Sequence, residues 1–154
     1  MTFDELVVAY TAGLDAQMAI LAQVEELATE QRATWSRNEL LPLGGLATRR
    51  AALMHELAAV EARIAPLYDR LRADLERALR TPGYGVAEAR RQEARGLIYR
   101  LMAADRTFLT DLETSLESRR RESHNIDTGN ATLAAYRRVV VPTVASAGLF
   151  DQRG

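Results

Sequence analysis

The sequence lacks cysteine and lysine and has few aromatic residues. Without cysteine, the chain cannot form disulfides, use a thiolate nucleophile or bind zinc through sulfur. Aromatic residues make up only 6% of the chain, whereas 47% is hydrophobic, with Ala and Leu prominent beside Arg and Glu. This composition is typical of long helices and offers little from which to build a sheet. We therefore predict an all-α protein of one domain.

The chain also lacks an excess of charge of either sign. Its 20 basic residues, all Arg, face 21 acidic residues and give a net charge of −1. No overall field therefore attracts nucleic acid or an anionic membrane, and we predict neither as a partner. Residues 1–31 contain acidic but no basic side chains. We expect this segment to dock against Arg-bearing neighbours, and the alternative is an acidic face kept for a partner.

Targeting signals are a further absence. The N-terminus, MTFDELVV, is acidic where a signal peptide would be basic, and no apolar run approaches the ~18 residues that a membrane span needs. These features predict a cytoplasmic protein without membrane insertion.

Apolar residues recur at helical spacing over three segments, at about 3–35, 46–80 and 86–123. Thr2 and Glu5 match a capping box at the first start, and SRNELLPLGG and TPGYG separate the segments. Pro66 predicts a kink near Ala65, because proline removes a helical hydrogen bond. Residues 1–124 should thus form an elongated antiparallel three-helix bundle or coiled coil.

The remaining segment, 125–154, differs in composition and is predicted to be a short, partly mobile C-terminal helical tail. HNIDTGN has the composition of a turn, and Asn130 can cap a helix over about 131–141. Leu133, Tyr136 and Val140 share one face of that helix, which Pro142 should end.

No pattern of catalytic or ligand-binding residues is found. Neither His55 nor His124 has a Glu three positions earlier, as a di-iron bundle requires, and Ala59 stands where a zinc-protease helix would carry its second His. The glycine pairs lack the spacing and the following Lys of a phosphate-binding loop. We predict that the protein is not an enzyme and has no catalytic residue, metal site or cofactor, which leaves protein–protein interaction.

The order of features resembles the flagellar export chaperones of the FlgN class. The plan of an amphipathic helix, a Leu-rich connection, two long coiled-coil helices and a short segment with a Tyr covers most of the chain. The closest local matches are TGNATLAAYRR at 128–138 and LFDQRG at 149–154.

This resemblance implies a cytoplasmic chaperone that binds the C-terminal helical region of hook-filament junction proteins. Such a chaperone prevents premature assembly and delivers its client to the flagellar type III export gate. By position, Tyr136 resembles the family's C-terminal Tyr implicated in partner contact, with Leu133 and Val140 on the same face. Together with Leu149 and Phe150, these are the predicted partner-binding residues.

Other interpretations remain open at this point. The chain can be a structural or adaptor coiled coil whose tail closes its own bundle, or a chaperone of the filament-cap protein. Surplus apolar positions in the first helix could also face a second copy in a homodimer.

Overall fold

The computed structural model describes residues 1–122 and 128–140, which form α-helices and turns without any strand. The helices are α1 (Phe3–Ser36), α2 (Leu40–Ala73), α3 (Leu75–Arg80) and α4 (Tyr84–Glu122). A further helix spans residues 128–140 and is called the C-terminal helix below. The prediction of an all-α bundle is confirmed.

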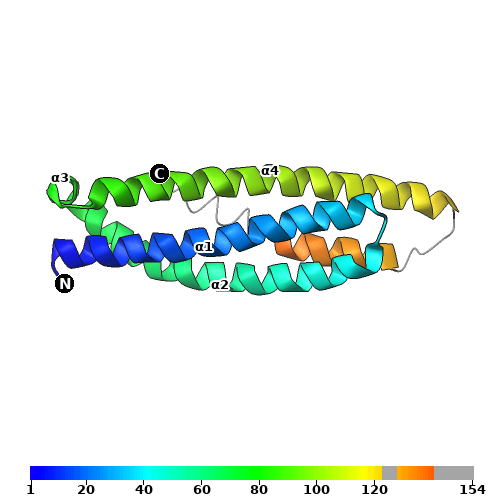
Figure 1. The fold of residues 1–154 in the computed structure, drawn as a ribbon, viewed down its shortest axis with the longest axis horizontal. Coiled ribbons are helices and arrows are strands. Elements are labelled where there is room, and N and C mark those ends of the chain that lie inside the picture. Colours follow the sequence, from blue (N-terminus) through cyan, green and yellow to red (C-terminus); the bar gives the residue numbers. More distant parts are fainter. Residues whose placement is uncertain (123–127, 141–154) are drawn as a thin grey trace.

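The helices are arranged around α1 along one long axis (Figure 1). α1 and α4 run in the same direction, and α2, which lies between them in the sequence, runs in the opposite direction. α3 crosses the end of the bundle near the N-terminus. α1 packs against both α2 and α4, whereas within the described helices no Cα of α2 lies within 8 Å of one of α4. The C-terminal helix lies along the half of the bundle far from α3 (Figure 1). That half therefore contains four helices.

The start and end of α1 follow the sequence prediction. The Glu5 amide donates to Thr2 Oγ1 at 3.1 Å, and the Thr2 amide donates to Glu5 Oε2 at 2.7 Å, which completes the capping box. After Ser36 the chain reverses in a short turn, where Asn38 has a φ of 57°. Asn tolerates this left-handed conformation better than most residues do, which suits it to follow a helix.

The second helix begins earlier than predicted. SRNELLPLGG was expected to be a break, but α2 starts at Leu40 and contains Pro42 and both glycines. Pro42 lies in the first turn, where backbone N–H groups have no intrahelical acceptor, so its missing N–H costs little. The proline was therefore wrongly interpreted as a break.

Pro66 does not break α2, and the kink expected near Ala65 stays a prediction. α2 continues as an α-helix through Pro66 to Ala73, and the backbone leaves the helical conformation at Asp74, with φ −136° and ψ 70°. Asp74 Oδ1 accepts from the Arg77 amide at 3.2 Å and caps α3. The single predicted helix over 46–80 is thus two helices. The turn before α4 requires Gly83, whose φ is 85°.

Three apolar clusters fill the bundle, and α1 contributes to all of them. One lies at the α3 end around Tyr10, Tyr68 and Leu71, one is central around Val24 and Leu57, and one includes the C-terminal helix. α1 is also the one described helix that is long and apolar enough to cross a membrane by length and composition. Core helices pass the same test, so the absence of membrane insertion stays a prediction.

Replacing Pro66 by Ala should raise stability. Proline inside a helix costs about 3 kcal/mol, and the exposed Pro66 site leaves room for Ala. We expect the free energy of unfolding, measured in urea, to increase by about 1–3 kcal/mol. Pro42→Ala is the matched control and should change it by less than about 0.5 kcal/mol, because first-turn proline is compatible with the helix. Equal effects of the two substitutions would contradict this account.

Candidate functional site

The C-terminal helix rests on a surface that α2 and α4 form together. Its buried side chains belong to one apolar cluster with Leu43, Leu46 and Ala47 of α2 and with Phe108, Leu112 and Leu116 of α4. We call these six residues the helix seat. α2 and α4 occupy opposite corners of the bundle, which leaves a gap between them. α1 covers one side of this gap, and the helix seat is the other side. It is a site built to hold one amphipathic helix.

Three side chains at intervals of three anchor the C-terminal helix. Leu133, Tyr136 and Val139 are 8%, 1% and 4% exposed. The Tyr136 ring lies edge-on to Phe108, with centroids 5.0 Å apart and an interplanar angle of 65°. Its hydroxyl donates to the carbonyl oxygen of Leu43 at 3.2 Å, so the one polar atom of this buried side chain has a partner. Tyr136 thus joins the helix to both sides of the seat.

Burial raises the pKa of Tyr136 above its ordinary value of 10.0. Desolvation is the largest cause, because the phenolate would lose its hydration inside the bundle. The Arg50 guanidinium opposes this shift, and the carboxylates of Asp105 and Glu30 add to it. The hydroxyl therefore keeps its proton while the helix is seated.

Close contacts to α4 hold the two ends of the C-terminal helix. Arg137 Nη2 donates to Glu113 Oε1 at 2.7 Å, and Arg120 Nη2 donates to Asn130 Oδ1 at 2.8 Å. Asn130 lies inside the helix, since residues 128 and 129 before it are already helical, so the prediction that it caps the helix is wrong. Gly129 is buried against Leu116, and a Cβ added to it would lie 2.2 Å from Leu116 Cδ2. The absence of a side chain at Gly129 permits this approach.

A charged pair lies in the interior beside Tyr136. The guanidinium of Arg50 in α2 donates to both carboxylate oxygens of Asp105 in α4, with Nη1 at 2.5 Å from Oδ1. Each side chain is 1% exposed. Sequence reasoning missed this pair, although a signal exists. Both residues stand on apolar stripes: Arg50 follows Leu43 and Leu46, and Asp105 falls between Leu101 and Phe108.

The predicted partner-binding residues fall into three groups. Leu133 and Tyr136 are anchors in the helix seat. Val140 is only partly buried, and Val139, which was not selected, provides the third anchor. Leu149 and Phe150 lie outside the described residues. The expected separate tail is, over 128–140, packed against the bundle. A role of these residues in binding a partner stays a prediction.

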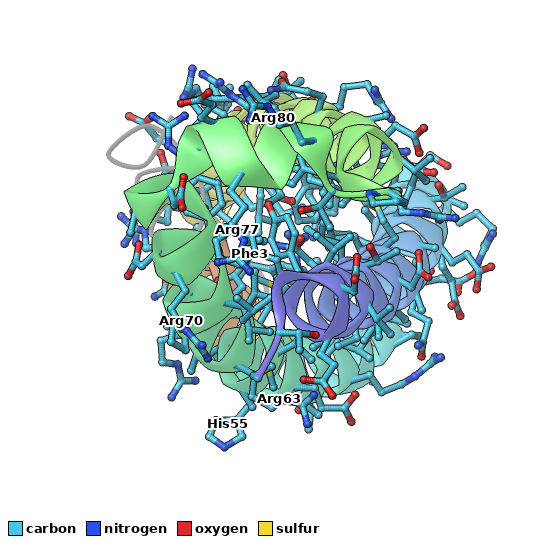
Figure 2. The ribbon with its side chains drawn as sticks, turned by 90° about the vertical axis from the view of Figure 1, so that its left-hand side faces the viewer. Phe3, His55, Arg63, Arg70, Arg77 and Arg80 are labelled. Atoms are coloured by element: carbon cyan, nitrogen blue, oxygen red, sulfur yellow. The ribbon has the colours of Figure 1, made fainter. Side chains whose placement is uncertain are left out.

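Exposed charge pairs join α1 to both of its long neighbours, α2 and α4. Asp15 of α1 pairs with Arg90 at 2.7 Å and Glu30 with Arg49 at 3.6 Å, in line with the expected docking of the acidic segment on Arg-bearing neighbours. All four side chains are about half exposed, so each pair contributes little. At the α3 end, the Arg77 guanidinium lies 4.4 Å from the centroid of Phe3 (Figure 2).

Within residues 1–122 and 128–140, no group of three His, Asp or Glu side chains could hold a metal ion. His55 projects away from the bundle (Figure 2), and His124 lies outside the described residues.

Comparison with known proteins adds no relative: no protein-family model, curated protein or solved structure matches the chain.

Gly129→Ala should weaken the seating of the C-terminal helix. The new methyl group would overlap Leu116, and relief of such overpacking costs about 1–3 kcal/mol. We expect faster hydrogen exchange in 128–140 and lower stability in urea. Gly45→Ala is the matched control, because it is also helical and nothing lies within 4 Å of its added Cβ. It should stabilise the protein by up to about 1 kcal/mol. Stabilisation by both substitutions would rule out a tight contact at Gly129.

Alkaline pH should destabilise the protein through Tyr136. Its pKa is raised in the folded state, so unfolding releases its proton above about pH 10. Stability is therefore fully present below that pH and is lost as pH rises further. We expect Tyr136→Phe to reduce the fall in unfolding free energy between about pH 9 and 11. Tyr99→Phe, at an exposed tyrosine, should leave that fall as in the wild type. An unchanged fall in Tyr136→Phe would contradict the assignment.

Proposed function

We propose that this chain is a cytoplasmic chaperone of flagellar export. It would bind the C-terminal helical region of hook-filament junction proteins, prevent their premature assembly and deliver them to the type III export gate. The proposal combines the resemblance in TGNATLAAYRR and LFDQRG with a structural feature that suits it, the helix seat.

The helix seat is the observation that carries the proposal. It accepts an amphipathic helix through Leu133, Tyr136 and Val139, which is the helix-in-groove mode of peptide recognition. A client that polymerises through amphipathic terminal helices would be masked if one of these helices occupied such a seat. The rim adds selectivity, since Glu113 of α4 pairs with a basic residue one turn after the first anchor.

Occupation of the seat by the chain's own helix constrains how a client would bind. Tyr136 is 1% exposed, so a partner cannot contact its side chain while the C-terminal helix is in place. Its accessible neighbours are Ala131, Ala134, Arg137 and Arg138, which offer small or charged side chains and no large apolar one. A client helix would therefore take the place of the C-terminal helix.

A second candidate function is a structural or adaptor bundle that the C-terminal helix closes permanently. The burial of Tyr136 and its hydrogen bond to Leu43 favour this alternative, because they are the contacts of a finished core. The two functions differ in whether the helix ever leaves its seat.

Affinity purification distinguishes these functions. The tagged wild type, Leu133→Asp and Ala134→Asp are expressed in the native host or a flagellated relative, and the proteins that co-purify are identified. Leu133→Asp places a charge in the seat and should release the helix, whereas Ala134→Asp adds the same charge to an exposed neighbouring position. We expect hook-filament junction proteins with the wild type and with Ala134→Asp. Leu133→Asp should bind their C-terminal region about tenfold more tightly or better, because the seat is empty.

Two results would change the proposal. Loss of the client from Leu133→Asp alone would mean that the client reads the C-terminal helix itself. Recovery of no flagellar protein with any of the three chains would reject the chaperone and favour the adaptor.

A further inference from the structure

The Arg50–Asp105 pair occupies a layer of the core where apolar residues are expected. Arg50 lies four residues after Leu46 and three after Ala47, and Asp105 lies three before Phe108, so both stand beside the helix seat. The pair also bridges α2 and α4, whose backbones do not approach each other in the described helices. It joins the two walls of the seat at their base.

A buried ion pair is a weak way to fill such a layer. Removing two charges from water costs more than their attraction commonly returns, and apolar residues of similar volume often give a more stable core. Tyr136 of the C-terminal helix packs edge-on against Phe108, one turn after Asp105 in α4, and its hydroxyl donates to the carbonyl oxygen of Leu43, which lies in the same helix as Arg50. When this helix leaves, water regains access to the pair on that side, and part of the desolvation cost is recovered.

The rest of the bundle can stay folded during such a departure. The central cluster and the cluster at the α3 end contain no residue of the C-terminal helix. α1 continues to pack against both α2 and α4 along the axis. A helix as short as residues 128–140 is also marginal in water on its own, so its amides should exchange freely once it is released.

We propose that the Arg50–Asp105 pair controls release of the C-terminal helix. It does so by lowering the net free energy gained when this helix packs into the helix seat. The charged base of the seat makes the open state tolerable in water, so the helix leaves and returns while the other helices remain packed. Where it concerns regulation of a partner site, this inference rests on the proposed function. The effect of the charged pair on helix release can nevertheless be measured in the free protein without any partner.

The test is segment-resolved hydrogen exchange on the full chain, comparing the wild type with the double variant Arg50→Met/Asp105→Leu. When both charges are replaced, release of the C-terminal helix no longer recovers the desolvation cost of the pair. Hydrogen exchange in 128–140 should therefore slow about tenfold or more. Asp105→Asn alone leaves the Arg50 charge without its carboxylate and should speed exchange there about tenfold or more. Adding Arg50→Met to Asp105→Asn should reverse that increase.

Gln17→Met is the control for a general effect of removing a buried polar group. Gln17 is 1% exposed and donates to Glu61 at 3.3 Å, in the central part of the bundle outside the helix seat. It should leave exchange in 128–140 within about twofold of the wild type, since it does not contact that helix.

Unchanged or faster exchange of 128–140 in the folded double variant would overturn the inference. So would an effect of Gln17→Met equal to that of the double variant. If the double variant fails to fold, an unchanged exchange rate in Asp105→Asn would overturn it equally. Failure of the proposed function looks different: the exchange rates respond as expected, but no junction protein binds any variant.

Discussion

The structure depends on the placement of α2 and α4 at opposite corners of the bundle, bridged by Arg50 and Asp105. α1 packs against both helices and closes one side of the gap between them. The other side needs a separate cover, and over half of the length the C-terminal helix supplies it. A three-helix bundle in close mutual contact would have no such gap, so the helix seat and the bridge arise from the same geometry.

The buried Arg50–Asp105 pair sets a requirement for the C-terminal helix beside it. The attraction between two charges with 1% exposure weakens when water reaches them. Phe108, one turn after Asp105, packs edge-on against both Trp35 and Tyr136. Tyr136 can serve there because its ring is apolar and its one polar atom reaches the Leu43 carbonyl. Buried ion pairs are commonly less stabilising than apolar residues of similar volume, and setting the register of the elements that they join is their best-attested role.

Helical periodicity was enough to predict the all-α fold and to place α1 within one residue of its observed end. The prediction of helix breaks from proline was less reliable, because the effect of proline depends on its position. Pro42 fits the first turn of α2, and Pro66 lies inside the same helix without ending it. In the C-terminal helix, Leu133, Tyr136 and Val140 were predicted to share one face, but Val139 is the third buried anchor, since the seat contacts the helix at intervals of three. Arg50 and Asp105 were missed because charges were assumed to be solvated, although each interrupts an apolar stripe.

Because the predicted partner-binding residues Leu133 and Tyr136 of the C-terminal helix are buried, one quantity distinguishes the two candidate functions: the free energy needed to release this helix. Leu133 and Tyr136 cannot contact a partner while they anchor the helix, so any binding through them or through the seat first requires release. The free energy of release then reduces the apparent affinity for a client by the fraction of open protein. A helix held by about 3 kcal/mol would lower that affinity about a hundredfold, which a strong helix-in-groove contact can tolerate, whereas a far more firmly held helix would act only as structure. The seat thus differs between a chaperone and an adaptor in the strength of closure, and the charged pair at its base is the feature that sets that strength.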